Sequence, residues 1–182
     1  DNLLTGGKSV NLLEKKFKNK FKCNYAISCS NGTSALFLAF KAIDLKPGDN
    51  IVMPAINFIS SYSMAKSLGA NIFLCDVDSK IGQLNVKNII NCINKNKIKK
   101  IKAIVSMYLG GYVEDNIDIF ELKKKLKCYL IEDSCHALGA KYKFNEKKHY
   151  IGSCKHSDIS TFSFHPVKSI TTGEGGLITT NS

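Results

Sequence analysis

The sequence predicts an α/β domain with a mostly parallel central sheet flanked by helices. Short apolar runs of strand length alternate along the 182 residues with segments whose apolar residues recur at helical spacing. No internal repeat, linker or low-complexity block interrupts this alternation. Residues 1–182 are therefore expected to form one domain, since this length is enough for a sizeable core.

Local signals place the elements of the N-terminal part. Ser9 is expected to cap a helix over residues 9–20, in which apolar residues recur three and four positions apart. A short apolar strand over 25–29 leads into the polar sequence 30–34, and an apolar helix is predicted over 35–43. The turn at 46–49 contains proline, glycine and aspartate, which ends this helix before the next strand.

The same alternation continues to the end of the chain. Apolar runs predict the further strands, and amphipathic segments predict the further helices. The predicted strands are 51–53, 71–77, 101–107, 128–132, a β-rich run over 158–164, and 177–180. The predicted helices are 58–68, 86–95 and 117–126.

The formal charge of +11 raises the question of nucleic-acid binding, but its composition argues against it. All 26 basic residues are lysine, so the bidentate arginine–guanine contact is absent. The lysines cluster in 15–22, 95–102, 123–127 and 141–148, interleaved with apolar or asparagine residues. This pattern favours solvated faces of helices and loops, and a role in attracting a diphosphate-bearing substrate stays open.

The seven cysteines indicate reduced, buried thiols. They form no Cys-x-x-Cys pair and no cluster with zinc-ligand spacing, so no metal site is expected. Several lie in apolar runs, which is typical of a protein in a reducing cytoplasm. No run of transmembrane length and no signal peptide is visible, so no membrane partner is expected.

One lysine lies in a distinctive setting, in the segment from Ser163 to Gly176 with the sequence SFHPVKSITTGEGG. Lys168 follows the predicted strand 158–164 and precedes a glycine-rich turn. A lysine held at such a position can form a Schiff base with a carbonyl, as enzymes that use pyridoxal 5′-phosphate require. A solvated surface lysine is the alternative interpretation in a chain so rich in lysine.

A second distinctive segment is EDSCHALGA, in which the acidic pair Glu132 and Asp133 ends an apolar strand and His136 follows. Ligands of open α/β sheets gather beyond the carboxyl ends of the strands. The polar segments 30–34 and 57–58 also follow predicted strands. Three independent segments therefore predict a site at one edge of the sheet.

Together these segments resemble the DegT/DnrJ/EryC/StrS family of sugar-nucleotide aminotransferases, whose members have the fold-type-I architecture of pyridoxal 5′-phosphate enzymes. The resemblance covers nearly the whole chain, from Leu4 to Gly176. The phrase around Lys168 is most similar to the branch that serves pseudaminic acid synthesis. Some family members carry histidine at the lysine position and are dehydratases, so the lysine of this chain implies transamination.

The resemblance implies roles for three residues around the cofactor ring. Lys168 would hold the cofactor and later move a proton between substrate and cofactor. Asp133 would hold the pyridine nitrogen protonated, although Glu132 competes for this role because adjacent strand residues face opposite sides. His136 would hydrogen-bond the ring oxygen of the cofactor, with a structural core histidine as the alternative.

Further residues are implied in binding the phosphate and the ring. The turn before the helix 35–43 would supply backbone N–H groups and hydroxyls to the phosphate through Gly32, Thr33 and Ser34. Ser163 matches a second phosphate-binding hydroxyl, and Phe58 matches the aromatic residue that stacks on the ring.

The roles of some neighbours are less defined. The family usually has threonine or serine where this chain has Asn57, whose role is open. Tyr62, Tyr108 and His165 are weak candidates for the substrate pocket. Glu174 is expected to be structural, in a turn whose glycines meet a need for positive φ.

The implied activity is a two-stage transamination. L-glutamate would donate its amino group, which then passes to the 4-keto group of a UDP-linked 4-keto-6-deoxy-N-acetylhexosamine. The resemblance also implies a homodimer and a C-terminal small domain beyond this chain. Alternatives are an aminotransferase for another nucleotide-linked keto-deoxysugar, a non-catalytic cofactor-binding remnant, and a binding module for acidic polymers.

Overall fold

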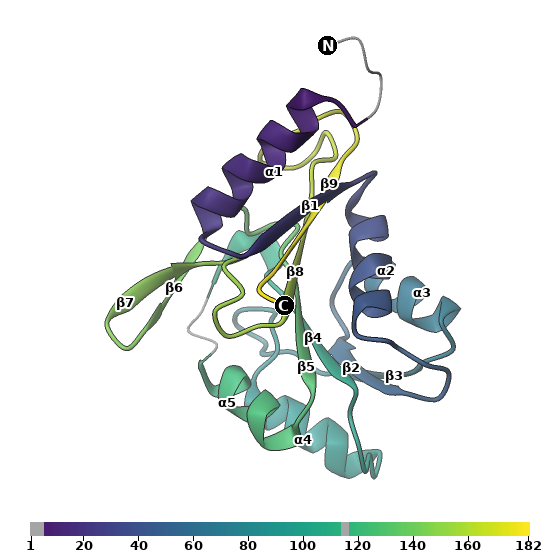
Figure 1. Cartoon of the computed structure of the whole chain (residues 1–182). Helices are drawn as coiled ribbons and strands as arrows, with labels where there is room; N and C mark the ends of the chain where they lie inside the picture. Colours follow the sequence, from purple (N-terminus) through teal and green to yellow (C-terminus); the bar gives the residue numbers. More distant parts are fainter. Residues whose placement is uncertain (1–5, 114–116) are drawn as a thin grey trace.

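The computed structural model describes residues 6–113 and 117–182 (Figure 1). Leu4 and Thr5, at the start of the family resemblance, lie outside the described residues. The helices are α1 (Lys8–Phe21), α2 (Gly32–Ala42), α3 (Ser60–Ser67), α4 (Val86–Lys95) and α5 (Ile117–Leu126), with a 3-10 turn η1 (Leu109–Gly111). The strands are β1 (Tyr25–Cys29), β2 (Asn50–Pro54), β3 (Asn71–Cys75), β4 (Ala103–Met107), β5 (Tyr129–Asp133), β6 (Lys141–Phe144), β7 (Lys147–Tyr150), β8 (Ile159–Ser163) and β9 (Gly176–Thr180).

The central sheet has seven strands in the order β1-β9-β8-β5-β4-β2-β3. Strands β8, β5, β4, β2 and β3 pair in parallel, whereas β9 is antiparallel to both of its neighbours. Strand β1 therefore points the same way as β8. The predicted mostly parallel sheet flanked by helices is confirmed, and the carboxyl ends of six of its seven strands lie at one edge.

Helices cover both faces of the sheet, with α2 and α3 on one side and α1, α4 and α5 on the other (Figure 1). Alternate residues of each central strand enter opposite cores. In β2, Val52 packs against the second group of helices, and Ile51 and Met53 pack towards α2 and α3. Complete burial of such side chains stabilises the fold by about 1.5–3 kcal/mol each.

Two helices begin earlier than predicted. Helix α1 begins at Lys8 after Gly7, so Ser9 lies inside the helix and is not its cap. Helix α2 begins at Gly32 because the side-chain oxygen of Asn31 accepts a hydrogen bond from Ser34 N–H at 2.8 Å. The asparagine cap places residues 32–34 within the first helical turn, which brings their backbone N–H groups to the edge of the sheet.

The sequence does not predict the hairpin of β6 and β7, because its lysine-rich run favours a solvated helix or loop. Asn145 and Glu146 both have positive φ, which is the backbone of a tight hairpin turn. The strands are fixed by buried aromatic contacts: Tyr142 packs edge-on against Phe120 of α5 at 5.4 Å between ring centroids. The exposed lysines of this hairpin therefore make its amphipathic strands difficult to recognise from the sequence.

The acidic pair at the end of β5 is divided between the two faces of the sheet. Glu132 lies on the side of α1, α4 and α5, fully buried, where it accepts hydrogen bonds from Tyr108 O–H at 2.5 Å, from Ser157 O–H at 2.8 Å and from Ser160 O–H. Burial raises the pKa of Glu132, and the three hydroxyl donors oppose that shift. Glu132 is thus a structural residue, which leaves Asp133 for the opposite face.

The described residues lack several other features. No helix among them is long and apolar enough to cross a membrane, and they contain no cluster of three metal-ligating side chains. All seven cysteines are free thiols, as the sequence predicts.

Substitution of Glu132 by alanine tests its structural role. Glu132→Ala should lower the free energy of unfolding by about 2–4 kcal/mol, because buried hydroxyl groups lose their acceptor and a cavity remains. Chemical denaturation measures this difference. Glu121→Ala, which removes an exposed carboxylate from α5, is the matched control and should leave stability nearly unchanged. Equal effects of the two substitutions would contradict the role of Glu132.

Candidate functional site

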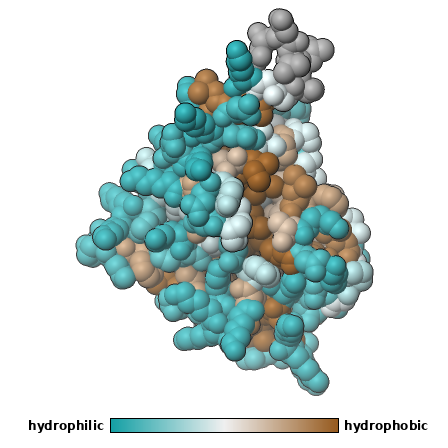
Figure 2. Space-filling view, viewed as in Figure 1, coloured by the Kyte–Doolittle hydropathy of each residue, from teal (hydrophilic) through white to brown (hydrophobic). Residues whose placement is uncertain are grey.

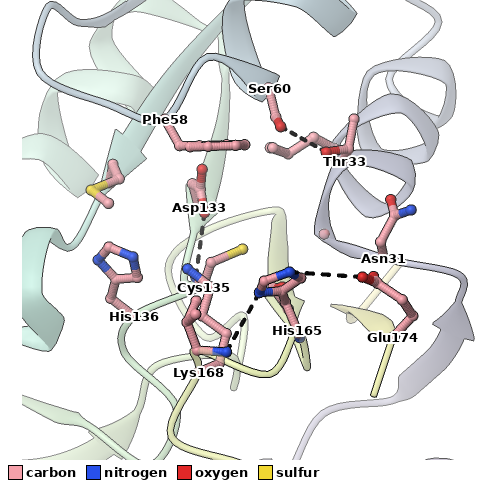
Figure 3. Close-up of a pocket in the computed structure, with 15 residues that line it drawn as sticks. Asn31, Thr33, Phe58, Ser60, Asp133, Cys135, His136, His165, Lys168 and Glu174 are labelled. Atoms are coloured by element: carbon pink, nitrogen blue, oxygen red, sulfur yellow. Dashed lines mark hydrogen bonds and ion pairs between the residues drawn. The ribbon is translucent and has the colours of Figure 1, made fainter. Parts of the chain in front are cut away.

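A cavity of about 310 Å³ lies at the edge of the sheet where the carboxyl ends of β1, β2, β4, β5 and β8 converge with the start of β9 (Figure 3). It is lined by Asn31, Gly32, Thr33, Leu36, Phe58, Ser60, Met107, Asp133, Cys135, His136, Ser163, His165, Val167, Lys168 and Glu174. All the cofactor-binding residues that the sequence predicts belong to this set except Ser34.

Lys168 lies in the loop that joins β8 to β9. Its backbone N–H donates to the carbonyl of His165 at 2.9 Å, which closes a turn and fixes the start of the side chain. The side chain is half-buried, and its charge acts on both Cys135 and His136. Lys168 therefore faces the segment that follows β5. Among the described residues, it is the only lysine that lines the cavity.

The carboxylate of Asp133 is 3% exposed and held from two sides. Ser61 Oγ donates to Oδ2 and the Cys135 backbone N–H donates to Oδ1, both at 3.3 Å. Asn57 in turn donates from Nδ2 to Ser61 Oγ at 3.1 Å. Asn57 thus gains a role that its sequence left open, as a positioning residue that orients the hydroxyl beneath Asp133.

His136 approaches the cavity as a neutral imidazole. Burial is the main cause that lowers the pKa of His136, and the charge of Lys168 lowers it further while Asp133 opposes the shift. The Gly110 backbone N–H donates to Nδ1 at 3.3 Å, so the proton of the neutral ring belongs on Nε2. A histidine in this state can donate one hydrogen bond to a ligand.

The first turn of α2 forms the floor of the cavity. Ser34 N–H donates to the Asn31 side chain and Ala35 N–H to the Asn31 carbonyl. The preceding amides of Gly32 and Thr33 have no acceptor among the described residues. Together with the Ser163 hydroxyl across the cavity, these amides form an anion-binding position at a helix N-terminus.

Ser34 is the predicted residue that the structure does not bring to the cavity. Its N–H caps the helix and its hydroxyl pairs with Ser30 Oγ at 2.9 Å. Its role in binding a phosphate stays a prediction. In the structure, only the first amides of the helix are left free, because Asn31 acts as the cap.

Phe58 lies over the cavity with Asp133 directly beneath it (Figure 3). The ring is 69% exposed, and its backbone N–H donates to Asn57 Oδ1 at 2.7 Å. Such exposure leaves a flat apolar surface facing the carboxylate. Tyr62 and Tyr108 do not line the cavity, and Tyr108 instead bonds Glu132 on the other face of the sheet.

The mouth of the cavity holds His165, a candidate from the sequence, together with Glu174, for which the sequence predicts only a structural role. Glu174 Oε1 lies 3.8 Å from His165 Nε2, so Glu174 lines the site in addition to belonging to a turn (Figure 3). Its glycine neighbours differ from the prediction, since Gly173 alone among them has positive φ. Gly176 is required for a different reason, because a Cβ there would meet the Asn31 carbonyl.

Cys135 and Ser60 also line the cavity, although the sequence analysis assigned them no role. Burial, followed by the charge of Asp133, raises the pKa of the Cys135 thiol, which stays protonated. Ser60 pairs with Thr33 Oγ1 at 2.7 Å and so links α3 to the anion-binding turn. Each of these two residues lies within two positions of a predicted site residue, and this proximity in the sequence could have indicated that they line the cavity.

These groups define a class of site. An amine, a carboxylate under an aromatic ring, a neutral imidazole and an anion-binding helix N-terminus surround a space of small-molecule size. They suit a flat, nitrogen-containing ring that carries an anionic group and a reactive carbonyl. Together they form a site at the carboxyl ends of the strands of an α/β fold, with a lysine at its wall.

The family model of the DegT/DnrJ/EryC1/StrS aminotransferase family matches residues 1–182, and the chain belongs to this family. The chain is 38% identical over 175 residues to GDP-perosamine synthase of Escherichia coli O157:H7, which covers 96% of the chain and 45% of that relative. It is 35% identical over 182 residues to the UDP-4-amino-4,6-dideoxy-N-acetyl-beta-L-altrosamine transaminase of Campylobacter jejuni, covering 100% of the chain and 46% of the relative.

Solved structures support the same assignment. A Streptococcus pneumoniae protein assigned as a sugar aminotransferase, in its PLP-form, superposes with a TM-score of 0.88 at 26% identity. The match covers 100% of this chain and 48% of that one. The predicted fold-type-I architecture is thereby confirmed, and the chain spans about half the length of the curated relatives it matches.

Substitution of Gly32 tests the packing of the anion-binding turn. A Cβ at Gly32 would lie 2.9 Å from Ser163 Cβ and 3.1 Å from Cys135 Sγ. The cost of overpacking, about 1–3 kcal/mol, should exceed the gain in helix propensity, which is at most about 1 kcal/mol. Gly32→Ala should therefore lower the free energy of unfolding measured with denaturant. Ser34→Ala in the same turn is the control and should change it little; a stabilised Gly32→Ala variant would refute the close contact.

Proposed function

We propose that this chain forms the cofactor-binding part of a pyridoxal 5′-phosphate-dependent aminotransferase that acts on a nucleotide-linked keto sugar. The observation that carries the proposal is that Lys168 and Asp133, 35 positions apart in the sequence, line one cavity under the Phe58 ring. An amine and a carboxylate in that relation are what the two ends of a pyridoxal ring require.

The residues present fit the cofactor. When bound, pyridoxal phosphate supplies an electron sink for a carbanion at the substrate carbon. The amides of Gly32 and Thr33 and the hydroxyl of Ser163 would hold the phosphate at the positive end of α2. The PLP-form of the Streptococcus pneumoniae relative supports this assignment.

Asp133, His136 and Phe58 would orient the ring. Asp133 would accept the proton of the pyridine nitrogen, and the bonds from Ser61 and Cys135 keep its carboxylate in place. His136 would donate from Nε2 to the ring oxygen, and Phe58 would stack on the ring and exclude water from one side.

Lys168 would act twice. Its amine would bind the cofactor carbonyl covalently and, once released, would carry a proton to or from the reacting carbon. The neighbouring Cys135 thiol remains neutral because its pKa is raised, so it would not compete with Lys168 as a nucleophile.

For the substrate, we infer a nucleotide-linked 4-keto-6-deoxyhexose that receives its amino group from L-glutamate. The specific form proposed from the sequence is a UDP-linked 4-keto-6-deoxy-N-acetylhexosamine, of the kind that serves pseudaminic acid synthesis. The 35% identity to the Campylobacter jejuni transaminase supports it. A GDP-linked sugar is the second candidate, since identity to the Escherichia coli GDP-perosamine synthase is 38%.

The proposal includes a homodimer in the complete protein. Apolar side chains beside the cavity lie uncovered in the single chain, with Phe58, Ile59 and Val167 all more than half exposed. A partner chain that covers this rim would complete the site and exclude water. A non-catalytic cofactor-binding remnant is the alternative that the first experiment distinguishes.

Loss of Lys168 should abolish both cofactor attachment and turnover. In the complete protein, Lys168→Ala should lose the visible absorption band that appears when pyridoxal phosphate is added, and activity should fall by at least about a thousandfold. In the wild type, L-glutamate should bleach the band. Absorption spectroscopy and an assay of 2-oxoglutarate release measure these effects.

Lys99→Ala removes an exposed lysine distant in sequence from the site and should preserve both signals. A wild type with the band but no bleaching by any amino donor would establish the remnant. Substantial activity in Lys168→Ala would overturn the aminotransferase proposal.

A substrate panel should separate the two nucleotide carriers. We expect the glutamate-loaded complete protein to aminate the UDP-linked 4-keto-6-deoxy-N-acetylhexosamine with a kcat/KM at least about tenfold above that for a GDP-linked 4-keto-6-deoxyhexose, which corresponds to about 1.4 kcal/mol of discrimination. Mass spectrometry of the amino-sugar products provides the rates. The reverse order would establish the second candidate in place of the first.

A further inference from the structure

A second cavity, of about 590 Å³, lies between the end of α1, the β6–β7 hairpin and the turn that precedes β8. It is called the lysine cleft here and is lined by Phe21, Lys22, Lys141, Lys147, Lys148, His149, Tyr150, Ser153 and Lys155. Five of its nine lining residues are lysines and none is acidic. In the space-filling view, hydrophilic side chains dominate the side of the molecule where the hairpin lies (Figure 2).

The charges of the lysine cleft are not neutralised by the rest of the described chain. None of the five lysines forms an ion pair with a described carboxylate. The nearest acidic residue of the hairpin, Glu146, pairs with Lys143 outside the cleft. The pKa of His149 is lowered, first by burial and then by the charges of Lys155 and Lys147, which agrees with a positive potential inside.

Aromatic rings form one wall of the lysine cleft. Lys141 Nζ lies 4.5 Å from the centroid of the Tyr150 ring, and Lys20 Nζ lies 5.6 Å from it. The Phe21 ring packs edge-on to the Tyr150 ring at 6.1 Å. The five lysines of the cleft are exposed, and the Lys141 ammonium group is oriented towards the Tyr150 ring.

The opposite wall is held by long-range hydrogen bonds. Asn181 donates from Nδ2 to the carbonyls of Ser153 and Cys154, at 3.0 and 2.8 Å. Gly152 and Cys154 both have positive φ, and a Cβ at Gly152 would lie within 3 Å of the Phe162 ring. The surrounding hydrogen bonds and packing hold this turn in its unusual backbone conformation. The turn also fixes the backbone that leads to Lys155.

The lysine cleft is separate from the cavity that contains Asp133 and Lys168, which is called the cofactor cavity below. The two cavities share no lining residue. Phe21 and Tyr150 belong to the core on the α1, α4 and α5 side of the sheet, whereas Asp133 and the first turn of α2 lie on the other side. A ligand in the lysine cleft would therefore not contact the reacting groups.

We propose that the lysine cleft is a second binding site, for a small molecule that carries a diphosphate group. Five lysines exceed what a single phosphate can neutralise, and a diphosphate provides more negative charge and more acceptor oxygens than one phosphate does. The volume is that of a small-molecule site, and its concave surface favours a compact ligand over an extended polyanion. The site does not depend on the proposed aminotransferase activity.

Titration calorimetry with inorganic pyrophosphate tests the proposal on the complete protein saturated with pyridoxal phosphate. Wild type should bind pyrophosphate at one site per chain, and the double variant Lys147→Gln, Lys148→Gln should weaken binding by at least about tenfold. Lys99→Gln, Lys100→Gln removes the same charge from another adjacent lysine pair and should change the dissociation constant by less than about threefold. Lys147→Arg, Lys148→Arg should retain binding, and so should Lys168→Ala.

UDP serves as the second probe. If UDP and pyrophosphate bind alike, a free diphosphate explains the site; if UDP binds more tightly and loses affinity in the Gln double variant, the ligand is a nucleotide whose base contacts the aromatic wall. Thermal unfolding verifies that each variant folds, and Lys155→Gln replaces the double variant if that one does not. Absence of pyrophosphate binding, or equal weakening in the Lys99 and Lys100 control, overturns the proposal.

Discussion

The alternation of side chains at the end of β5 is the constraint on which the rest of this structure depends. Two acidic residues are adjacent there, and the pleat sends one to each face of the sheet. Glu132 is enclosed by hydroxyl groups and ties β5 to the segment before β8. Asp133 is left on the other face, at the edge where the carboxyl ends of the strands converge. A one-residue shift in the register of β5 would turn Glu132 towards the cavity and Asp133 towards the hydroxyl groups. Neither carboxylate would then keep its role.

The site is built from close packing as much as from polar groups. Gly32 and Gly176 allow the first turn of α2 to approach the ends of β8 and β9, so the free amides of α2 reach the cavity that Lys168 enters. The carboxylate of Asp133 is positioned through Ser61 by Asn57, a residue of the loop that also carries Phe58. One loop thus orders both the ring above the cavity and the carboxylate beneath it, which is the preorganisation that cofactor chemistry requires.

The two faces of the sheet have different electrostatic characters. At the cavity on the α2 and α3 side, Asp133 accepts hydrogen bonds, and His165 lies beside Glu174. On the side of the hairpin, lysines gather around Tyr150 without described carboxylates to balance them. The net charge of +11 is therefore concentrated in part on a concave surface away from the cofactor cavity.

The sequence alone determined the alternation of strands and helices and predicted several of the residues that line the cavity. These features depend on local information: hydrophobic period, turn residues, and short segments such as the one around Lys168. Tertiary structure decided the rest. Whether Ser34 reaches the cavity depended on which atom caps α2, and the role of Asn57 depended on Ser61 and on Asp133, 76 positions away. The hairpin and the lysine cleft could not be predicted from the sequence. A lysine on a convex surface and a lysine that lines a cleft have the same local sequence signal, and only the packing of distant segments distinguishes them.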